Sequence, residues 1–238
     1  MPKQNLENAR LPSLWKFSVA CIGVTLCYCY LVLMAGVLNT PTNNYVFSDV
    51  FWDMWNHLRH FDVSVTPELI GDEGFRMGNK TTAYFLPLPA LVRGFLSIFQ
   101  LEKSALSSIL LATFFFITGS VILWRSVFGY LYTQKITQSI NAYRLGIMFF
   151  SFCTPIMVNL TYPGIFSEAI TWGAASFVFA AALSARLLYV QHQSTPTALY
   201  LVFALSCGAA LFTRATFSFA SCWLFFLTSI LLVYQRRC

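Results

Sequence analysis

Residues Ser104 to Trp124 read SALSSILLATFFFITGSVILW, an uninterrupted run of 21 residues without a charged side chain. A helix needs about 20 apolar residues to cross a hydrocarbon layer of about 30 Å. This run therefore predicts a membrane-spanning helix. Five other apolar runs predict further spans, at Phe17 to Leu38, Leu145 to Leu160, Ile165 to Val190, Ala198 to Thr213 and Phe217 to Tyr234.

The whole chain shares this apolar character. Of its 238 residues, 57% are hydrophobic, 17% are aromatic and only 10% are charged, whereas an ordinary soluble domain carries about 25% charged residues. These values exclude a soluble globular protein, and the 24 Phe and 11 Tyr exclude a disordered chain. Nucleic-acid binding is not expected despite the net charge of +6, because the basic residues are scattered and mostly flank apolar runs. We expect an all-α, polytopic helical protein in membrane lipid.

The seven cysteines do not indicate a disulfide framework. Six of them lie inside apolar runs and Cys238 is the last residue. We interpret them as small buried hydrophobic residues.

The distribution of charge predicts six spans and a cytoplasmic N-terminus. If Tyr84 to Gln100 does not cross the membrane, the inner segments contain nine basic residues and one acidic residue, while the other eight acidic residues lie outside. Lys and Arg are enriched in cytoplasmic loops, so this arrangement is preferred to seven spans. Phe17 to Leu38 is long for a signal peptide and lacks a convincing cleavage site, and so is expected to be a retained anchor. One membrane domain covers residues 1–238, with a cytoplasmic N-terminus (1–16), an outer loop (39–103) and a helical bundle (104–238).

Two interfacial helices are expected in the outer loop. Val46 to Phe61 has apolar residues at helical spacing, with Ser48 as N-cap, which predicts an amphipathic helix lying in the membrane interface. Asp49, Asp53 and His57 follow one another at spacing four and share one face of this helix. That face is either simply solvated, or binds a divalent cation, or supplies a carboxylate as general base.

The second interfacial helix is expected at Tyr84 to Gln100. Pro87 and Pro89 lie near its start, where proline is tolerated. The side chain of Arg93 either extends to the lipid headgroups or binds a lipid phosphate.

Two charged residues stand out near the outer ends of the predicted spans. Glu168 follows the helix-breaking Pro163 and Gly164; it either serves a function in a polar cavity or interacts with a helix dipole. Arg214 lies in a tight outer turn, on the side that charge bias disfavours for arginine. Its guanidinium suits a phosphate or carboxylate, or else extends to the headgroups.

Several stretches resemble a known family of membrane enzymes. Gly71-Asp72-Glu73-Gly74-Phe75 and the segment GNKTTAYFLPLPAL, residues 78–91, are similar to a pattern of bacterial GT-C-like proteins, approximately G-x-E-G and D-G-K-T-Y-x-Y-F-G-P-x-P-A-L. YPGIFSEAITWG (162–173) and GAALFTRAT (208–216) are similar to an acidic loop and a G-x-A-x-L-T-R stretch. The chain thus resembles the GT-C superfamily of polytopic glycosyltransferases from Phe17 onward. Leu86 and Thr82 depart from the pattern, where glycine and tyrosine are expected.

The resemblance implies transfer of a sugar from a polyprenyl-phosphate donor to an acceptor at the outer face of a bacterial inner membrane. Such a reaction needs a carboxylate base beside cationic or metal stabilisation of the leaving phosphate. The residues it implies as catalytic are Asp53, Asp49 and Glu168, and those it implies for substrate binding are Arg93, Arg214, His57, Tyr84 and Tyr162. Whether a divalent cation takes part stays open.

Two other functions remain open from the sequence. The resemblance implies more spans than the sequence shows, so we expect a minimal or truncated form, a fragment, or a non-catalytic scaffold or accessory subunit working with a partner membrane subunit. A small-molecule transporter is the third alternative, although no inverted repeat or mid-bilayer charge supports it.

Overall fold

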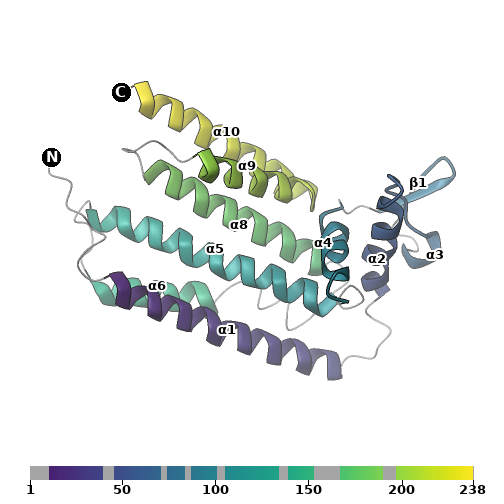
Figure 1. Ribbon diagram of the computed structural model, residues 1–238, viewed down its shortest axis with the longest axis horizontal. Helices are drawn as coiled ribbons and strands as arrows, with labels where there is room; N and C mark the ends of the chain where they lie inside the picture. Colours follow the sequence, from purple (N-terminus) through teal and green to yellow (C-terminus); the bar gives the residue numbers. More distant parts are fainter. Residues whose placement is uncertain are drawn as a thin grey trace.

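Long helices dominate the structure. The computed structural model describes residues 11–39, 46–70, 74–83, 87–100, 105–133, 139–152, 167–189 and 197–237. The helices that run along the long axis of the molecule form a bundle (Figure 1): α1 (Leu11–Asn39), α5 (Ala105–Thr133), α6 (Ile140–Phe152), α8 (Ser167–Tyr189), α9 (Thr197–Leu211) and α10 (Ala215–Arg237).

Four of these helices are long and apolar enough to cross a membrane. Their apolar segments are Trp15–Val32, Ser107–Tyr132, Glu168–Leu188 and Thr216–Tyr234. The described parts of α6 and α9 span 13 and 15 residues, short of the about 20 that a single bilayer crossing requires. The four long helices indicate a membrane lipid environment, and the count of six spans stays a prediction.

The beginning of α6 differs from the predicted span Leu145 to Leu160. The helix starts at Ile140, because Tyr143 and Ile147 pack with Cys21 of α1 and Val121 of α5 and so extend its buried face toward the N-terminus. The second half of the predicted span, residues 153–166, lies outside the described residues.

The most extensive helix pair of the bundle is α5 with α8. Its core contains Phe116 and Ile117 of α5 and Trp172 and Ala175 of α8. The indole Nε1 of Trp172 donates a hydrogen bond of 2.9 Å to Ser108 Oγ, so the one polar atom of this buried ring is satisfied. The two helices approach closely at Gly119, where an added Cβ would lie 3.0 Å from the backbone of Phe179.

A group of shorter elements caps one end of the bundle (Figure 1). It comprises α2 (Val46–Leu58), α3 (Pro67–Ile70), the strands β1 (Gly74–Met77) and β2 (Lys80–Ala83), and α4 (Leu88–Ser97). We call these elements the end module. Within it, α2 and α4 run across the direction of the long helices (Figure 1).

The apolar face of α2, which the amphipathic pattern directed toward lipid, packs on protein. Its apolar residues Val50, Phe51 and Met54 are buried against other protein residues, among them Ala90 of α4 and Ala169 of α8. The helix does have one apolar face, but the apolar surface that this face meets belongs to the protein. The prediction of Ser48 as N-cap was also wrong, because α2 begins at Val46 and Ser48 lies in its first turn.

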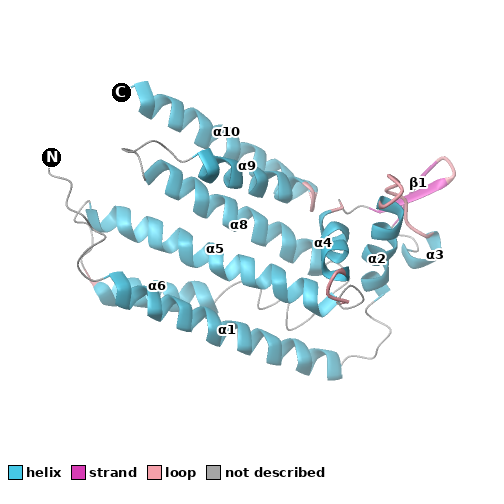
Figure 2. Ribbon diagram, viewed as in Figure 1, coloured by secondary structure: helices cyan, strands magenta, loops and turns pink. Residues whose placement is uncertain are grey.

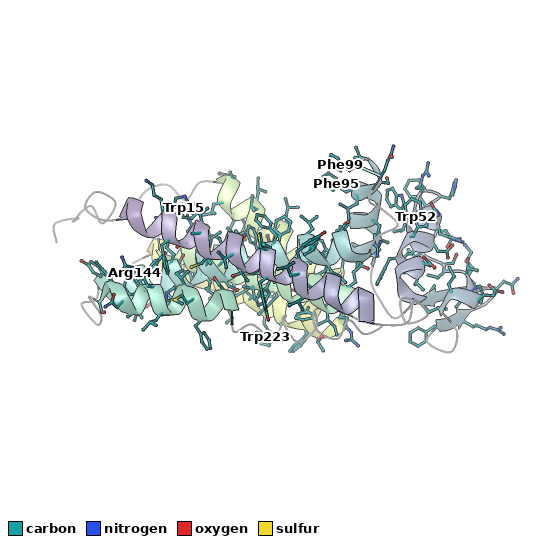
Figure 3. The ribbon with its side chains drawn as sticks, turned by 90° about the horizontal axis from the view of Figure 1, so that it is seen from below. Trp15, Trp52, Phe95, Phe99, Arg144 and Trp223 are labelled. Atoms are coloured by element: carbon teal, nitrogen blue, oxygen red, sulfur yellow. The ribbon has the colours of Figure 1, made fainter. Side chains whose placement is uncertain are left out.

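The helix α4 forms within the predicted segment Tyr84 to Gln100. Pro87 precedes it and Pro89 occupies its first turn, where the missing N–H costs no helical hydrogen bond. Trp55 of α2 packs so closely on Gly94 that a Cβ there would lie 2.5 Å from the indole. The opposite face exposes Leu91, Phe95, Ile98 and Phe99, and Figure 3 shows Phe95 and Phe99 at the edge of the molecule. This exposed apolar face suits a position at a membrane interface.

The end module also contains a β-hairpin that was not predicted (Figure 2). Strands β1 and β2 pair antiparallel, with Gly74 opposite Ala83 and Met77 opposite Lys80. The two-residue turn is Gly78-Asn79, and Gly78 has a φ of 65°, which glycine adopts without strain. Apart from this hairpin, the expected helical class is confirmed.

An ion pair connects the hairpin to the preceding loop and predicts a dependence on pH. Lys80 Nζ lies 2.6 Å from Asp62 Oδ2. This hydrogen bond, followed by one from the Ser64 N–H, lowers the pKa of Asp62 from 3.8 to about 2. Because the pKa is lowered by folding, the pair stabilises the hairpin above about pH 4 and loses that contribution as the pH falls toward 2.

We expect a pH titration of the carboxyl groups, monitored by NMR, to give Asp62 a pKa of about 2. In a Lys80→Met variant the pKa should move back toward 3.8, stopping short of it because the Ser64 N–H remains. An unchanged pKa in this variant would show that Lys80 does not hold the carboxylate.

Charge is distributed unequally between the two ends of the bundle. Among the described residues, Lys16, Arg125, Arg144 and Arg186 lie in the half away from the end module, and no acidic residue accompanies them there. Arg125 packs over the ring of Trp15, and Arg144 packs over the ring of Phe17; Figure 3 shows Trp15 and Arg144 in this half. The acidic residues Asp49, Asp53, Asp62, Glu68 and Glu168 belong to the end module or to the adjoining start of α8.

Candidate functional site

A buried ion pair joins the end module to the bundle. Arg93 Nε lies 3.0 Å from Glu168 Oε1, and Arg93 Nη2 lies 2.8 Å from Glu168 Oε2. This is the parallel, two-bonded geometry in which guanidinium and carboxylate interact most strongly. Arg93 is fully buried and Glu168 is 5% exposed. The sequence singles out the two residues separately, and the structure brings them together.

The local sequence explains why both charges point inward. On α4, Arg93 lies one turn after Ala90, and both residues are buried, as is the neighbouring Gly94. On α8, Glu168 lies in the first turn beside Ala169, which contacts the apolar residues of α2. The predicted extension of Arg93 to the headgroups is therefore wrong: its guanidinium is directed into the protein, because Glu168 offers it a carboxylate there.

The turn between α9 and α10 lies beside the start of α4. Leu88 is the first residue of α4, where no carbonyl within the helix is available to accept a hydrogen bond from the backbone N–H. The Leu88 N–H donates instead to the Phe212 carbonyl, over 2.9 Å. The turn is itself held by Thr213 Oγ1, which donates to the Ala210 carbonyl, and by Ser218 Oγ, which donates to the Leu211 carbonyl. Arg214, in this turn, is half-buried. The turn thus carries Arg214 to the end of the bundle where α4 lies.

Asp53 and His57 interact on one face of α2, as their spacing predicted. Asp53 Oδ1 lies 3.8 Å from His57 Nε2, while Asp53 Oδ2 accepts a 2.7 Å hydrogen bond from the Thr66 N–H. His57 Nδ1 lies 2.9 Å from Ser64 Oγ. No sequence pattern indicates Ser64, whose contact with His57 depends on the turn after α2. Asp53 is thereby held in one orientation, with Oδ1 facing the histidine.

Of the remaining predicted residues, the structure describes only Asp49. Asp49 is exposed in the first turn of α2. Tyr84 and Tyr162 lie outside the described residues. In the part of the chain that the structure describes, no group of three His, Cys, Asp or Glu side chains is placed to hold a metal ion.

A shallow apolar groove lies far along the bundle from these charges. Its volume is about 380 Å³, and Ser229, Ile230, Val233 and Tyr234 of α10 line it. None of these side chains is charged at neutral pH. The groove therefore offers no charged group for catalysis or for binding a phosphate. The candidate site is the junction of α2, α4, the start of α8 and the α9–α10 turn.

Comparison with known proteins adds no assignment: no family model matches the chain, and no curated protein or solved structure matches it at a significant level.

Proposed function

We propose that this protein is a GT-C-like glycosyltransferase that moves a sugar from a polyprenyl-phosphate donor to an acceptor at the end of the bundle covered by the end module. The observation that carries the proposal is the Arg93–Glu168 pair, which fixes α4 on α8. Around this junction lie the helix that bears Asp53 and the turn that bears Arg214. A carboxylate and a cation from separate parts of the chain are thus available at one end of the bundle.

The transfer makes two electrostatic demands that these residues suit. The acceptor hydroxyl must lose a proton, which calls for a general base, and the departing lipid phosphate carries negative charge, which calls for a cation. Asp53 is the preferred base, because Thr66 fixes its carboxylate while Oδ1 faces His57. Arg214 is the preferred phosphate ligand. Tyr84 and Tyr162 stay proposed substrate-binding residues.

Glu168 receives a different role from the one that the resemblance implied. Both of its carboxylate oxygens accept hydrogen bonds from Arg93, so it is poorly suited to orienting an acceptor hydroxyl or holding a metal ion. We assign the pair to positioning α4.

The charge distribution supports an orientation for this reaction. The half of the bundle that carries Lys16, Arg125, Arg144 and Arg186 would face the cytoplasm, since Lys and Arg are retained on that side. The end module would then lie on the outer side of a bacterial inner membrane. The N-terminus would lie on its cytoplasmic side.

An Asp53→Asn variant tests the general base. The side-chain amide oxygen can still accept the Thr66 N–H, but it cannot take a proton from the acceptor. We expect sugar transfer to fall by about 10²- to 10⁴-fold, measured with labelled polyprenyl-phosphate sugars and purified protein in lipid, with and without divalent cations.

Glu68→Gln is the control, because it neutralises a carboxylate of the end module at an exposed position on α3. It should leave transfer nearly unchanged. Full activity of the Asp53→Asn variant would exclude Asp53 as base.

A non-catalytic accessory subunit is the second candidate, and one observation favours it. Only 11% of the apolar segment of α10 is buried in the described structure, which leaves Phe219, Trp223 and Phe226 exposed. Such a face suits either lipid or the helices of a partner membrane subunit. Saturable donor binding without turnover would indicate that a partner or acceptor is missing, whereas failure to bind any donor would favour the accessory subunit.

A further inference from the structure

The helices α9 and α10 face each other through a regular series of residue pairs. Tyr200 Oη lies 3.2 Å from Ser229 Oγ. About one turn further along, the rings of Phe203 and Phe225 stack with centroids 5.8 Å apart. At the end of the series, Ser218 Oγ donates a 2.8 Å hydrogen bond to the carbonyl of Leu211.

One further pair of facing residues fits between the stacked rings of Phe203 and Phe225 and the final hydrogen bond of Ser218. In an antiparallel helix pair, facing residues step by three or four along one helix while they step back by three or four along the other. Cys207 follows Phe203 by four residues, and Cys222 precedes Phe225 by three. The two cysteines therefore occupy facing positions, and they lie close enough for a charge on one thiol to affect the other.

The two thiols differ in access. Cys207 is buried at 3% exposure, whereas Cys222 is partly exposed. Cys222 lies in the apolar segment Thr216–Tyr234. The pair thus combines a thiol that a lipid-soluble reagent can reach with a second thiol, shielded from reagents, that faces it.

We propose that Cys207 and Cys222 form a dithiol site that closes to a disulfide between α9 and α10, with a small organic disulfide as oxidant. The bond would fix the turn that carries Arg214, which lies between the two cysteines in the sequence. The site does not depend on the proposed transferase activity. In the orientation supported by the charge distribution, this turn lies on the outer side, where disulfides persist.

The reaction proceeds by two exchanges. The thiolate of Cys222 attacks one sulfur of the oxidant, which forms a mixed disulfide and expels one thiol of the reagent. The sulfur of Cys207 then attacks Cys222 Sγ, loses its proton and expels the second thiol. Two protein thiols are oxidised to one disulfide, and the reagent disulfide is reduced to two thiols.

The test uses the full chain in lipid with 2,2′-dipyridyl disulfide, followed by alkylation of the remaining thiols and digestion with trypsin. Cleavage after Arg186, Arg214 and Arg236 separates Cys207 and Cys222 into peptides 187–214 and 215–236. We expect mass spectrometry of the monomer to find these peptides joined, two hydrogen masses below their sum, and separated again by a reducing agent.

A double variant, Cys207→Ser with Leu205→Cys, serves as the matched control. It keeps the number of thiols but moves one to a side chain that is 72% exposed and so faces away from the interface. The joined peptides should disappear. Two alkylated peptides from the oxidised wild type, or joined peptides found only in a disulfide-linked dimer, would overturn the proposal.

Discussion

Replacing Glu168 with leucine is expected to destabilise the protein by about 3–5 kcal/mol, the usual cost of removing one partner of a buried ion pair. Arg93 is fully buried and cannot lose its proton at neutral pH. Its charge would stay in a site from which water is excluded, without the carboxylate that accepts two of its hydrogen bonds. The expected consequence is release of α4 from the start of α8.

A double-mutant cycle separates the charge effect from simple loss of packing. The variants are Glu168→Leu, Arg93→Met and the two combined, compared by denaturant unfolding in mixed micelles. The combined variant should be more stable than either single variant, because two apolar side chains of similar size leave no buried charge.

Glu68→Leu provides the control, since Glu68 is exposed on α3 and should change stability by only about 0.5 kcal/mol. Additive effects of the two single substitutions would mean that Arg93 and Glu168 are not energetically coupled.

The second large effect is expected at Gly119, where α5 meets α8. A Cβ at this position would lie 3.0 Å from the backbone N and Cα of Phe179. A backbone cannot move aside as a flexible side chain can, so Gly119→Leu must push the two helices apart. Association of helices in lipid depends on such close packing, and overpacking typically costs about 1–3 kcal/mol or more.

Gly23→Leu is the matched control, because an added Cβ on α1 at that position meets nothing within 4 Å. Unfolding in mixed micelles should show a clear loss for Gly119→Leu and little change for Gly23→Leu. Equal stability of the two variants would contradict the packing of α5 on α8.

The sequence predicted those features that depend on local patterns. Apolar runs identified the long helices, and the prolines at 87 and 89 located the start of α4. The spacing of Asp53 and His57 predicted that they share a face. Helix ends were less well predicted: α6 begins five residues before Leu145, because a buried face continues through Tyr143 although Arg144 adds a charge.

The features that were missed depend on contacts between distant segments. Arg93 and Glu168 are each unusual in the sequence, but nothing in either segment indicates that they pair across 75 residues. The apolar face of α2 was assigned to lipid, because its pattern cannot distinguish a lipid surface from Ala90 and Ala169. The Gly78-Asn79 turn does carry a local hairpin signal, which the resemblance of residues 78–91 to the family pattern obscured.

The bonds that fasten the end module also set the order in which the protein can be completed during synthesis. Domains generally form from the N-terminus as the chain emerges, yet Arg93 must wait for Glu168, and Leu88 must wait for Phe212. The segment made early can therefore dock only after α8 and α9 have been produced. A nascent chain halted before α8 would already contain α4, but it would lack Glu168 and the rest of the surface on which α4 docks.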